Sequence, residues 1–595
     1  MSENSDGKGS ASRSRRRQPA SARNSQYMIA PAGLGVTRQS LVDRLNQFGN
    51  VEIVRTYPER EGISPPIAVV RASDESAAAL RRSTAGGFVI EPDWHLRAAS
   101  FAGASPQMPV IAAMTAFGPG FNVTVQALSE SGEPVENAAV QLVGERGTVQ
   151  GLTDREGKVD LTLFGELPET ITELFIKPRS GHWGLWWHRP ELRSDTLNAF
   201  TLEPLSLPEA LHWGGQAMRF DRLPPECRGG GIKIALIDSG VATSHKQLTG
   251  IDHGINVRDG EQRSWSQDDI GHGTPCAGII RAAADSAHGI RGYAPDSELH
   301  VCRLPADARC SDLVAAIDYC LQAGIDVACL GFGCERGSAI VEQRIAAAKQ
   351  QGIGIIAAAG NSAAAVLFPA SSPHVMAVGA IGQLGSYPDD SPQAFEAAAG
   401  VTVARGLFVP PFSCRGPELD LSAPGVAAIT CQSPDGYAVC DGTSIATAHV
   451  TALAALILAH HSDFKGAFAK RDFQRVERMF QILKATAQPI GHPWLTGAGL
   501  PDAARALGVW SASRPMAATL NAELAEMRSA IRQLNQIHLS AASEMNLFEP
   551  PRGPANVTPL PLNPAPWTFV PERGAEASVH ELRAAMMLAG LSDAR

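Results

Sequence analysis

The sequence predicts an α/β protein whose largest domain is a doubly wound parallel sheet, preceded by two smaller domains. Short, almost continuously apolar segments are typical of strands buried on both faces, and five occur at 232–237, 299–304, 327–330, 353–358 and 375–380. Helical patterns such as 313–323 and 342–350 alternate with these segments, as in doubly wound folds. Polar residues directly follow several of the strands, where open α/β sheets bind their ligands.

Length and composition exclude several classes of protein. A chain of 595 residues is too long for one compact domain, so we expect several. The net charge of -9 is small for this length and argues against a nucleic-acid partner. No apolar run is expected to be long enough to span a bilayer. The polar N-terminus, with Arg15, Arg16 and Arg17, is not followed by the apolar stretch of a secretory signal.

The cysteines indicate the compartment. All ten lie between Cys227 and Cys440, and several fall within apolar strand or helix patterns. We therefore expect buried free thiols in a reducing environment rather than a disulfide framework. Together with the missing signal, this predicts a cytoplasmic protein, with non-classical export as the alternative.

Five regions are expected along the chain. The second follows the order strand, helix, strand, strand, helix, strand of a ferredoxin-like unit, with Asp74 as N-cap of its second helix. The third shows short alternating strands separated by turns, as in a β-sandwich. The expected regions are a disordered basic arm (1–24), a ferredoxin-like α+β domain (25–103), a small β-sandwich (108–205), the α/β domain (215–509) and a helical, Pro-rich extension of unknown partner (510–595).

Four polar residues are candidates for one catalytic site. Asp238 ends one apolar strand, Asn361 follows another, and His272 precedes an expected helix. Ser444 stands where a long apolar helix begins, so unpaired backbone N–H groups beside its hydroxyl favour an oxyanion. Because the carboxyl ends of parallel strands meet at one edge of a sheet, we expect all four side chains to gather there.

These residue types suit nucleophilic catalysis. A serine hydroxyl attacks only when a base takes its proton, and His272 can take it and return it to a leaving group. Asp238 would orient that imidazole. Asn361 would donate its amide to an oxyanion beside the Ser444 N–H, and such a donor contributes about 3–4 kcal/mol of transition-state stabilisation. Each short motif alone has an ordinary explanation as a turn or helix cap, but their joint order is specific.

The same residues lie in segments that resemble the four signature blocks of subtilisin-like serine proteases, at 238–240, 272–278, 358–361 and 442–447. Segments 289–295, 421–425 and 497–500 resemble further landmarks of that family. The resemblance covers residues 215–509. It implies a serine endopeptidase that cuts a protein or peptide substrate through an acyl-enzyme on Ser444, without a cofactor. Family members often bind structural calcium, but no ligand loop for it is readable here and no metal ligand is predicted.

Residues 25–103 resemble the inhibitor-type propeptide of the same family, including the closing segment 89–95. This resemblance implies a self-processing zymogen whose own propeptide-like domain lays its tail in the active-site cleft. We expect self-cleavage between about Ala98 and Ser105, with Ala98 and Ala99 fitting the specificity pocket. A generic binding module of the same fold is the alternative.

Departures from the family pattern bear on the substrate. The strand that flanks bound substrate is here Gly331-Phe332-Gly333, and it keeps the backbone groups that pair with a peptide. Phe332 is expected to enlarge one wall of the specificity pocket. Leu367, near Gly360, is expected at its floor. These residues predict small or apolar side chains before the scissile bond.

Two other functions are consistent with the sequence. Ala448 stands where the family has proline, and the extra room beside Ser444 suggests an amine acceptor, which would make the protein a transpeptidase or peptide cyclase. The other is a non-catalytic binding protein with a silent protease domain.

Overall fold

The computed structural model describes residues 25–509 of the chain, apart from residues 49, 85–86, 99–119, 208–211, 259, 261–263 and 284–289. By its contacts the chain divides into two parts, Met1–Trp510 and Ser511–Arg595, and all described residues belong to the first part. Within that part, the first unit is the region 25–98, the second unit is 120–202 and the large unit is 213–509. The predictions for residues 1–24, Ala99 and residues 510–595 therefore lie outside the described residues.

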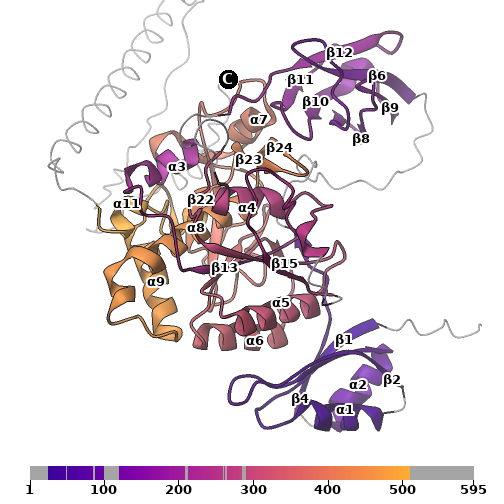
Figure 1. Ribbon diagram of the computed structural model, residues 1–595. Coiled ribbons are helices and arrows are strands. Elements are labelled where there is room, and N and C mark those ends of the chain that lie inside the picture. The colour runs from indigo at the N-terminus through magenta and orange to yellow at the C-terminus, as the bar shows by residue number, and fades with distance from the viewer. Residues whose placement is uncertain are drawn as a thin grey trace, which may run out of the picture. The chain divides into compact units, whose positions relative to one another are not determined.

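The first described segment is a four-stranded antiparallel sheet, in the order β2-β3-β1-β4, with two helices (Figure 1). Leu41 and Leu45 of one helix and Leu80 of the other are buried against the sheet. The elements are β1 (Ser25–Pro31), α1 (Arg38–Asn46), β2 (Val51–Tyr57), β3 (Ile67–Ala72), α2 (Asp74–Ser83), β4 (Phe88–Pro92) and β5 (Arg97–Ala98).

The expectation that Asp74 caps α2 is wrong by one residue. Ser73 has extended backbone angles, and its side chain accepts a hydrogen bond from the Ser76 N–H, so Ser73 is the N-cap. Asp74 is the first helical residue, and its carboxylate accepts a hydrogen bond from the Tyr27 hydroxyl at 2.5 Å. Both Ser73 and Asp74 are residue types suited to the N-cap, and only the backbone conformation shows which of them occupies it.

Residues 120–202 form two sheets around one apolar core, in the orders β11-β10-β7-β8 and β12-β6-β9. Val125, Leu142 and Leu174 are fully buried between the sheets. The elements are β6 (Gly120–Ser129), β7 (Ala139–Gly144), β8 (Thr148–Leu152), β9 (Lys158–Phe164), η1 (Pro168–Thr170), β10 (Ile171–Lys177), β11 (Leu185–His188) and β12 (Leu197–Leu202).

The largest sheet has nine strands and confirms the α/β class predicted for this region. Its parallel part runs β14-β15-β13-β16-β18-β19, with β22 beside β19, and β21 and β20 extend it antiparallel. The strands are β13 (Lys233–Asp238), β14 (His253–Asn256), β15 (Glu298–Arg303), β16 (Val327–Leu330), β18 (Gly354–Ala358), β19 (Met376–Gln383), β20 (Val401–Thr402), β21 (Leu407–Val409) and β22 (Leu421–Pro424). Outside this sheet lie β17 (Phe332–Gly333) and the hairpin of β23 (Ala428–Gln432) and β24 (Gly436–Cys440).

Helices cover both faces of this sheet. α5 and α6 pack side by side against one apolar cluster, and α4, α8 and α9 belong to the other (Figure 1). The helices are α3 (Trp213–Ala217), η2 (Phe220–Arg222), η3 (Ser264–Ser266), α4 (Gly273–Arg281), α5 (Cys310–Ala323), α6 (Ala339–Gln350), α7 (Pro392–Ala399), η4 (Ala404–Gly406), α8 (Thr443–His460), η5 (Ser462–Lys465), α9 (Phe473–Thr486), α10 (Pro493–Thr496) and α11 (Ala503–Ala506).

Helix α8 departs from the expectation that no apolar run could span a bilayer. Its 18 residues are long and apolar enough by length and composition alone, the one such helix among the described residues. However, 89% of this helix is buried inside the fold, where it contacts β16, β18, β19 and α4. Its apolar character is thus accounted for by core packing.

Close packing of α4 on the β23–β24 hairpin gives a stability prediction. A Cβ on Gly278 would overlap Thr430 Oγ1 and lie 2.9 Å from the Cys431 backbone nitrogen. We expect Gly278→Ala to push α4 away and to cost about 1–3 kcal/mol of the free energy of unfolding. Thermal unfolding would show a lower Tm. The matched control is Gly337→Ala, because a Cβ there meets no atom within 4 Å. Equal Tm values for the two variants would contradict the packing argument.

Candidate active site

The four predicted residues come together at the carboxyl edge of the parallel sheet. Asp238 is the last residue of β13, and Asn361 follows β18 after a short turn. His272 is the residue from which α4 begins, and Ser444 lies in the first turn of α8. Each side chain is thus fixed by the end of a buried strand or the start of a buried helix.

A continuous chain of hydrogen bonds joins three of these side chains. His272 Nδ1 lies 2.5 Å from Asp238 Oδ1, and His272 Nε2 lies 2.9 Å from Ser444 Oγ. All three residues are buried, with at most 3% of their surface exposed. With the Nδ1–H donating to the carboxylate, Nε2 accepts from the hydroxyl and is placed to take its proton.

A second buried acid, which the sequence reasoning did not single out, holds the segment that carries His272. Asp268 accepts hydrogen bonds from the Ser239 hydroxyl at 2.7 Å, the Gly271 N–H at 2.8 Å and the Thr274 N–H at 2.8 Å. The Ser239 hydroxyl in turn accepts from the Gly273 N–H at 2.9 Å. Asp268 therefore ties the end of β13 to the start of α4. The one hint of this role in the sequence is that Asp268 lies four residues before His272.

Asn361 presents a donor to the same space. Its Oδ1 accepts hydrogen bonds from Thr443 N at 3.0 Å and Thr443 Oγ1 at 2.8 Å. These two bonds fix the amide so that its nitrogen faces away from Thr443. That buried Nδ2 has no hydrogen-bond partner among the described residues. A buried unpaired donor beside a helix N-terminus is suited to an oxyanion.

The expected substrate-flanking strand carries the tail of the first unit. β17 pairs antiparallel with β5, so that Phe332 lies opposite Ala98 and Gly333 opposite Arg97. The Phe332 ring stands edge-on to His272, with centroids 5.8 Å apart. β5 therefore extends β17 as a further antiparallel strand, and the Phe332 ring links this pair to His272.

Gly331, predicted to bind substrate, lies directly beside the acid and the base. A Cβ at this position would overlap Asp238 Oδ2 and lie 2.9 Å from His272 Cε1. Leu367 packs over Gly333 and Gly360, where added Cβ atoms would lie 3.3 and 2.7 Å from its carbon atoms. Leu367 thus packs on two of the predicted pocket glycines, Gly333 and Gly360. Gly331 instead contacts Asp238 and His272, and its missing side chain leaves room for them.

On the other side of Ser444 lies a cavity of about 310 Å³ that the second unit helps to line. Asn137, Lys177 and Arg179 of that unit face the same space as His272 and Ser444. Trp186, one of three clustered tryptophans, docks against the large unit, with its ring centroid 5.5 Å from that of Phe395.

Two other residues near Ser444 are structural. Burial raises the pKa of Cys276 well above its usual value, so its thiol is protonated at neutral pH and packs 3.8 Å from the Ser444 carbonyl. Ala448, expected to leave room beside Ser444, is fully buried in the core of α8. All ten cysteines are free thiols, as predicted.

A buried acid pair supports the turn that precedes Ser444. Asp441 accepts hydrogen bonds from the Ala427 N–H at 2.8 Å and the Gln393 side chain at 2.7 Å, and Lys177 Nζ lies 3.8 Å away. Glu396 lies close by. Burial, and then the charge of Asp441, raise the pKa of Glu396 to about 8, although Lys177 acts in the opposite direction. Glu396 is therefore protonated at neutral pH.

This raised pKa predicts a pH-dependent stability. Between the unfolded value near 4.5 and the folded value near 8, the folded chain holds a proton that the unfolded chain releases. The stabilisation is complete below the lower value and is lost as the pH rises toward 8. We expect the Tm of Glu396→Gln, relative to the wild type, to increase between pH 5 and pH 9. The exposed Glu418→Gln serves as control, and parallel Tm profiles for all three proteins would contradict the assignment.

Comparisons with known proteins agree with this geometry. The family model described as "Subtilase family" matches residues 229–500. Subtilisin BL of Lederbergia lenta is 33% identical over 279 residues, which are 46% of this chain and 90% of that protein. An alkaline protease of Alkalihalobacillus alcalophilus is 28% identical over 401 residues, 64% of this chain and 89% of that protein. Fervidolysin from Fervidobacterium pennivorans, a keratinolytic enzyme related to subtilisin, has a similar fold, with a TM-score of 0.52. The two sequences are 16% identical, and the match covers 82% of this chain and 61% of the fervidolysin chain.

Proposed function

The chain belongs to the subtilase family and is a subtilisin-like serine endopeptidase, and from this premise we propose that Ser444 is its nucleophile. The single observation that carries the proposal is the hydrogen-bonded chain from Asp238 through His272 to Ser444. Ser444 Oγ attacks the peptide carbonyl while His272 Nε2 takes its proton, and Asp238 stabilises the imidazolium. His272 then protonates the leaving amine. Water, deprotonated by the same base, releases the acyl group.

We propose that Asn361 Nδ2 and the Ser444 N–H stabilise the oxyanion of each tetrahedral intermediate. The support is the unpaired Nδ2 and its fixed direction, since Thr443 holds the other end of the amide. A donor fixed before the reaction needs no reorganisation as negative charge develops, so its contribution falls on the transition state rather than on substrate binding.

This role predicts a selective loss of kcat. Asn361→Ala is expected to lower kcat by about 10²–10³-fold with little change in KM. Rates are normalised to the fraction of Ser444 that a fluorophosphonate labels, with Ser444→Ala as the unlabelled blank. Ser362→Ala is the matched control, because that neighbouring hydroxyl contacts Cys414 instead. If Asn361→Ala and Ser362→Ala have similar kcat values, Asn361 is not the oxyanion donor.

Residues 25–98 are proposed to be a ferredoxin-like, inhibitor-type propeptide of the protease. Two carboxylates of this unit cap two helices of the large unit. Glu91 accepts hydrogen bonds from Ser338 Oγ, from Ala339 N at 3.0 Å and from Ile340 N at 3.2 Å, all at the start of α6. Carboxylates at helix N-termini satisfy unpaired N–H groups and interact favourably with the helix dipole.

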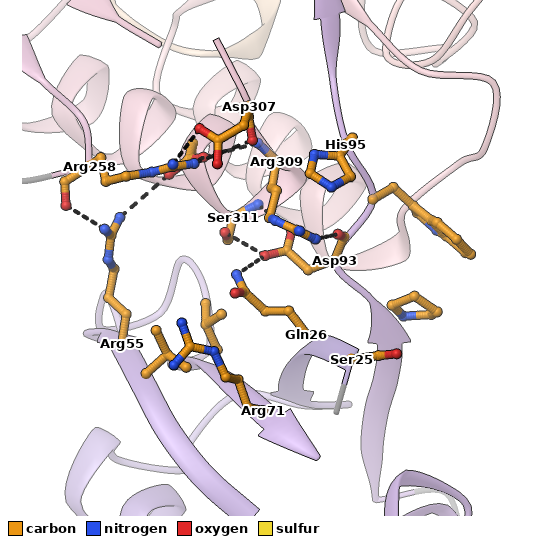
Figure 2. A pocket seen from close by; sticks show the side chains of 15 residues that line it. Ser25, Gln26, Arg55, Arg71, Asp93, His95, Arg258, Asp307, Arg309 and Ser311 are labelled. Carbon is orange, nitrogen blue, oxygen red and sulfur yellow. Dashed lines mark hydrogen bonds and ion pairs between the residues drawn. The ribbon is translucent and has the colours of Figure 1, made fainter. Parts of the chain in front are cut away.

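The second carboxylate, Asp93, does the same at α5. It accepts from Ser311 N at 2.9 Å and Ser311 Oγ at 2.7 Å, and Gln26 donates to it from its own unit. Figure 2 shows Asp93 between Gln26 and Ser311, beside a cavity of about 680 Å³ that both units line. These caps and the β5–β17 pairing support a propeptide that is specific for this enzyme, rather than a generic binding module.

We further propose a self-processing zymogen in a reducing, cytoplasmic setting, whose two-sheet unit is a β-sandwich module that stays on the protease. The pairing of Ala98 with Phe332, whose ring stands edge-on to His272, supports cleavage shortly after Ala98. The free thiols support the compartment. The similarity to the alkaline protease extends over more of the chain than residues 229–500, which supports a longer precursor organisation. No observation favours a transpeptidase or a silent protease domain.

Self-processing is testable on the purified full chain. Mass spectrometry of the wild type is expected to find a new N-terminus between Ala98 and Ser105, and Ser444→Ala is expected to keep the full length. The reason is that the tail already lies along β17. Processing that persists in Ser444→Ala, or a first new N-terminus after residue 200, would contradict the proposal.

A further inference from the structure

Three side chains with metal-ligating atoms meet at the amino end of the parallel sheet, opposite the catalytic edge. β14 and β15 are parallel neighbours, and their register places His253 beside His300. Glu298 precedes His300 by two residues on the same strand, so both side chains project from the same face. The sheet therefore presents two imidazoles and one carboxylate together.

The ligating atoms converge. Glu298 Oε1 lies 2.7 Å from His300 Nε2 and 3.6 Å from His253 Nε2, and the two rings stack with centroids 4.7 Å apart. One ligand atom from each residue lies within 4.8 Å of the other two. Donors about 2.0–2.2 Å from a tetrahedral ion are about 3.3–3.6 Å apart. The spacing of Glu298 and His253 already fits this range, and binding requires the two stacked rings to turn so that each directs its Nε2 lone pair at the ion. Among the described residues, the other comparable group is Asp238, His272 and Cys276, which the catalytic chain engages.

The surroundings support the ligands. The Tyr319 hydroxyl lies 2.9 Å from His300 Nδ1 and orients the ring, so that with a metal on Nε2 the Nδ1–H donates to Tyr319. Lys233 Nζ lies 3.3 Å from Glu298 Oε1 and competes with an ion for the carboxylate. Lys233 also donates to the Ala323 carbonyl at 3.4 Å, so it keeps an acceptor when an ion takes Glu298.

We infer that His253, Glu298 and His300 bind one divalent transition-metal ion of the zinc class. Two imidazole nitrogens and one carboxylate oxygen suit Zn²⁺, whereas Ca²⁺ and Mg²⁺ prefer sets of oxygen ligands. Three protein ligands leave a fourth position for water. The ion joins β14 to β15 at the start of the segment that leads to His272, so binding stabilises the fold that holds the catalytic base. The site is independent of the peptidase reaction.

The test uses the full chain carrying Ser444→Ala, which prevents self-cleavage. Calorimetric titration with Zn²⁺ is expected to show one ion per chain, and Co²⁺ is expected to give the visible absorption of a four-coordinate site. Saturating Zn²⁺ is expected to raise the Tm by a few degrees. His253→Ala and Glu298→Gln should each abolish all three effects. His374→Ala is the matched control, because its imidazole lies 4.0 Å from Glu342 in a half-exposed pair without a second histidine.

Three outcomes would overturn the inference. One is the absence of saturable Zn²⁺ binding by the Ser444→Ala chain. Another is one-to-one binding that survives both His253→Ala and Glu298→Gln. The third is binding that Cys276→Ser abolishes while His253→Ala retains it, which would assign the ion to the catalytic group. All three are read from binding and Tm, so they do not depend on whether the protein cleaves peptides.

Discussion

The double engagement of one imidazole is the interaction on which the site depends. His272 must bond Asp238 with one nitrogen and Ser444 with the other, at 2.5 and 2.9 Å, although these residues come from three distant segments. The parallel sheet meets this requirement because β13 ends at the same edge where α4 and α8 begin. Each helix is then fixed by the apolar core beneath it, so the core holds the catalytic distances.

That geometry needs backbone segments to approach closely. Asp238 and His272 leave no space for a side chain at residue 331. Likewise, the β23–β24 hairpin leaves no space for a side chain at residue 278 of α4. Asp268 adds polar restraints, because it bonds to Ser239, Gly271 and Thr274 around the histidine. The small residues and the buried acid therefore serve the same purpose as the core helices: they keep the base from moving.

Each of the two smaller units contributes residues beside the edge of the sheet that carries Ser444. The tail of the first lies along β17, where the residues before a scissile bond are held, and Glu91 and Asp93 anchor that unit to α6 and α5. Lys177 and Arg179 of the second border the cavity beyond Ser444. Both regions thus lie beside the residues proposed for catalysis, which is consistent with the proposed zymogen.

Local patterns were enough to predict the α/β class and the family, and to single out the four residues that the structure brings together, because apolar strands, polar residues at strand ends and glycine-rich turns are all visible in short segments. The substrate-binding roles of Phe332 and Leu367 stay predictions from their motifs. The folded chain was needed to show that Ser73 rather than Asp74 caps α2, that Gly331 makes room for Asp238 and His272, and that Asp268 holds the segment around His272. It also showed that Lys177 borders the same cavity as Ser444 and that the rings of His253 and His300 stack. These contacts join residues far apart in the chain, and no local pattern records them, because strand register and domain docking set the distances.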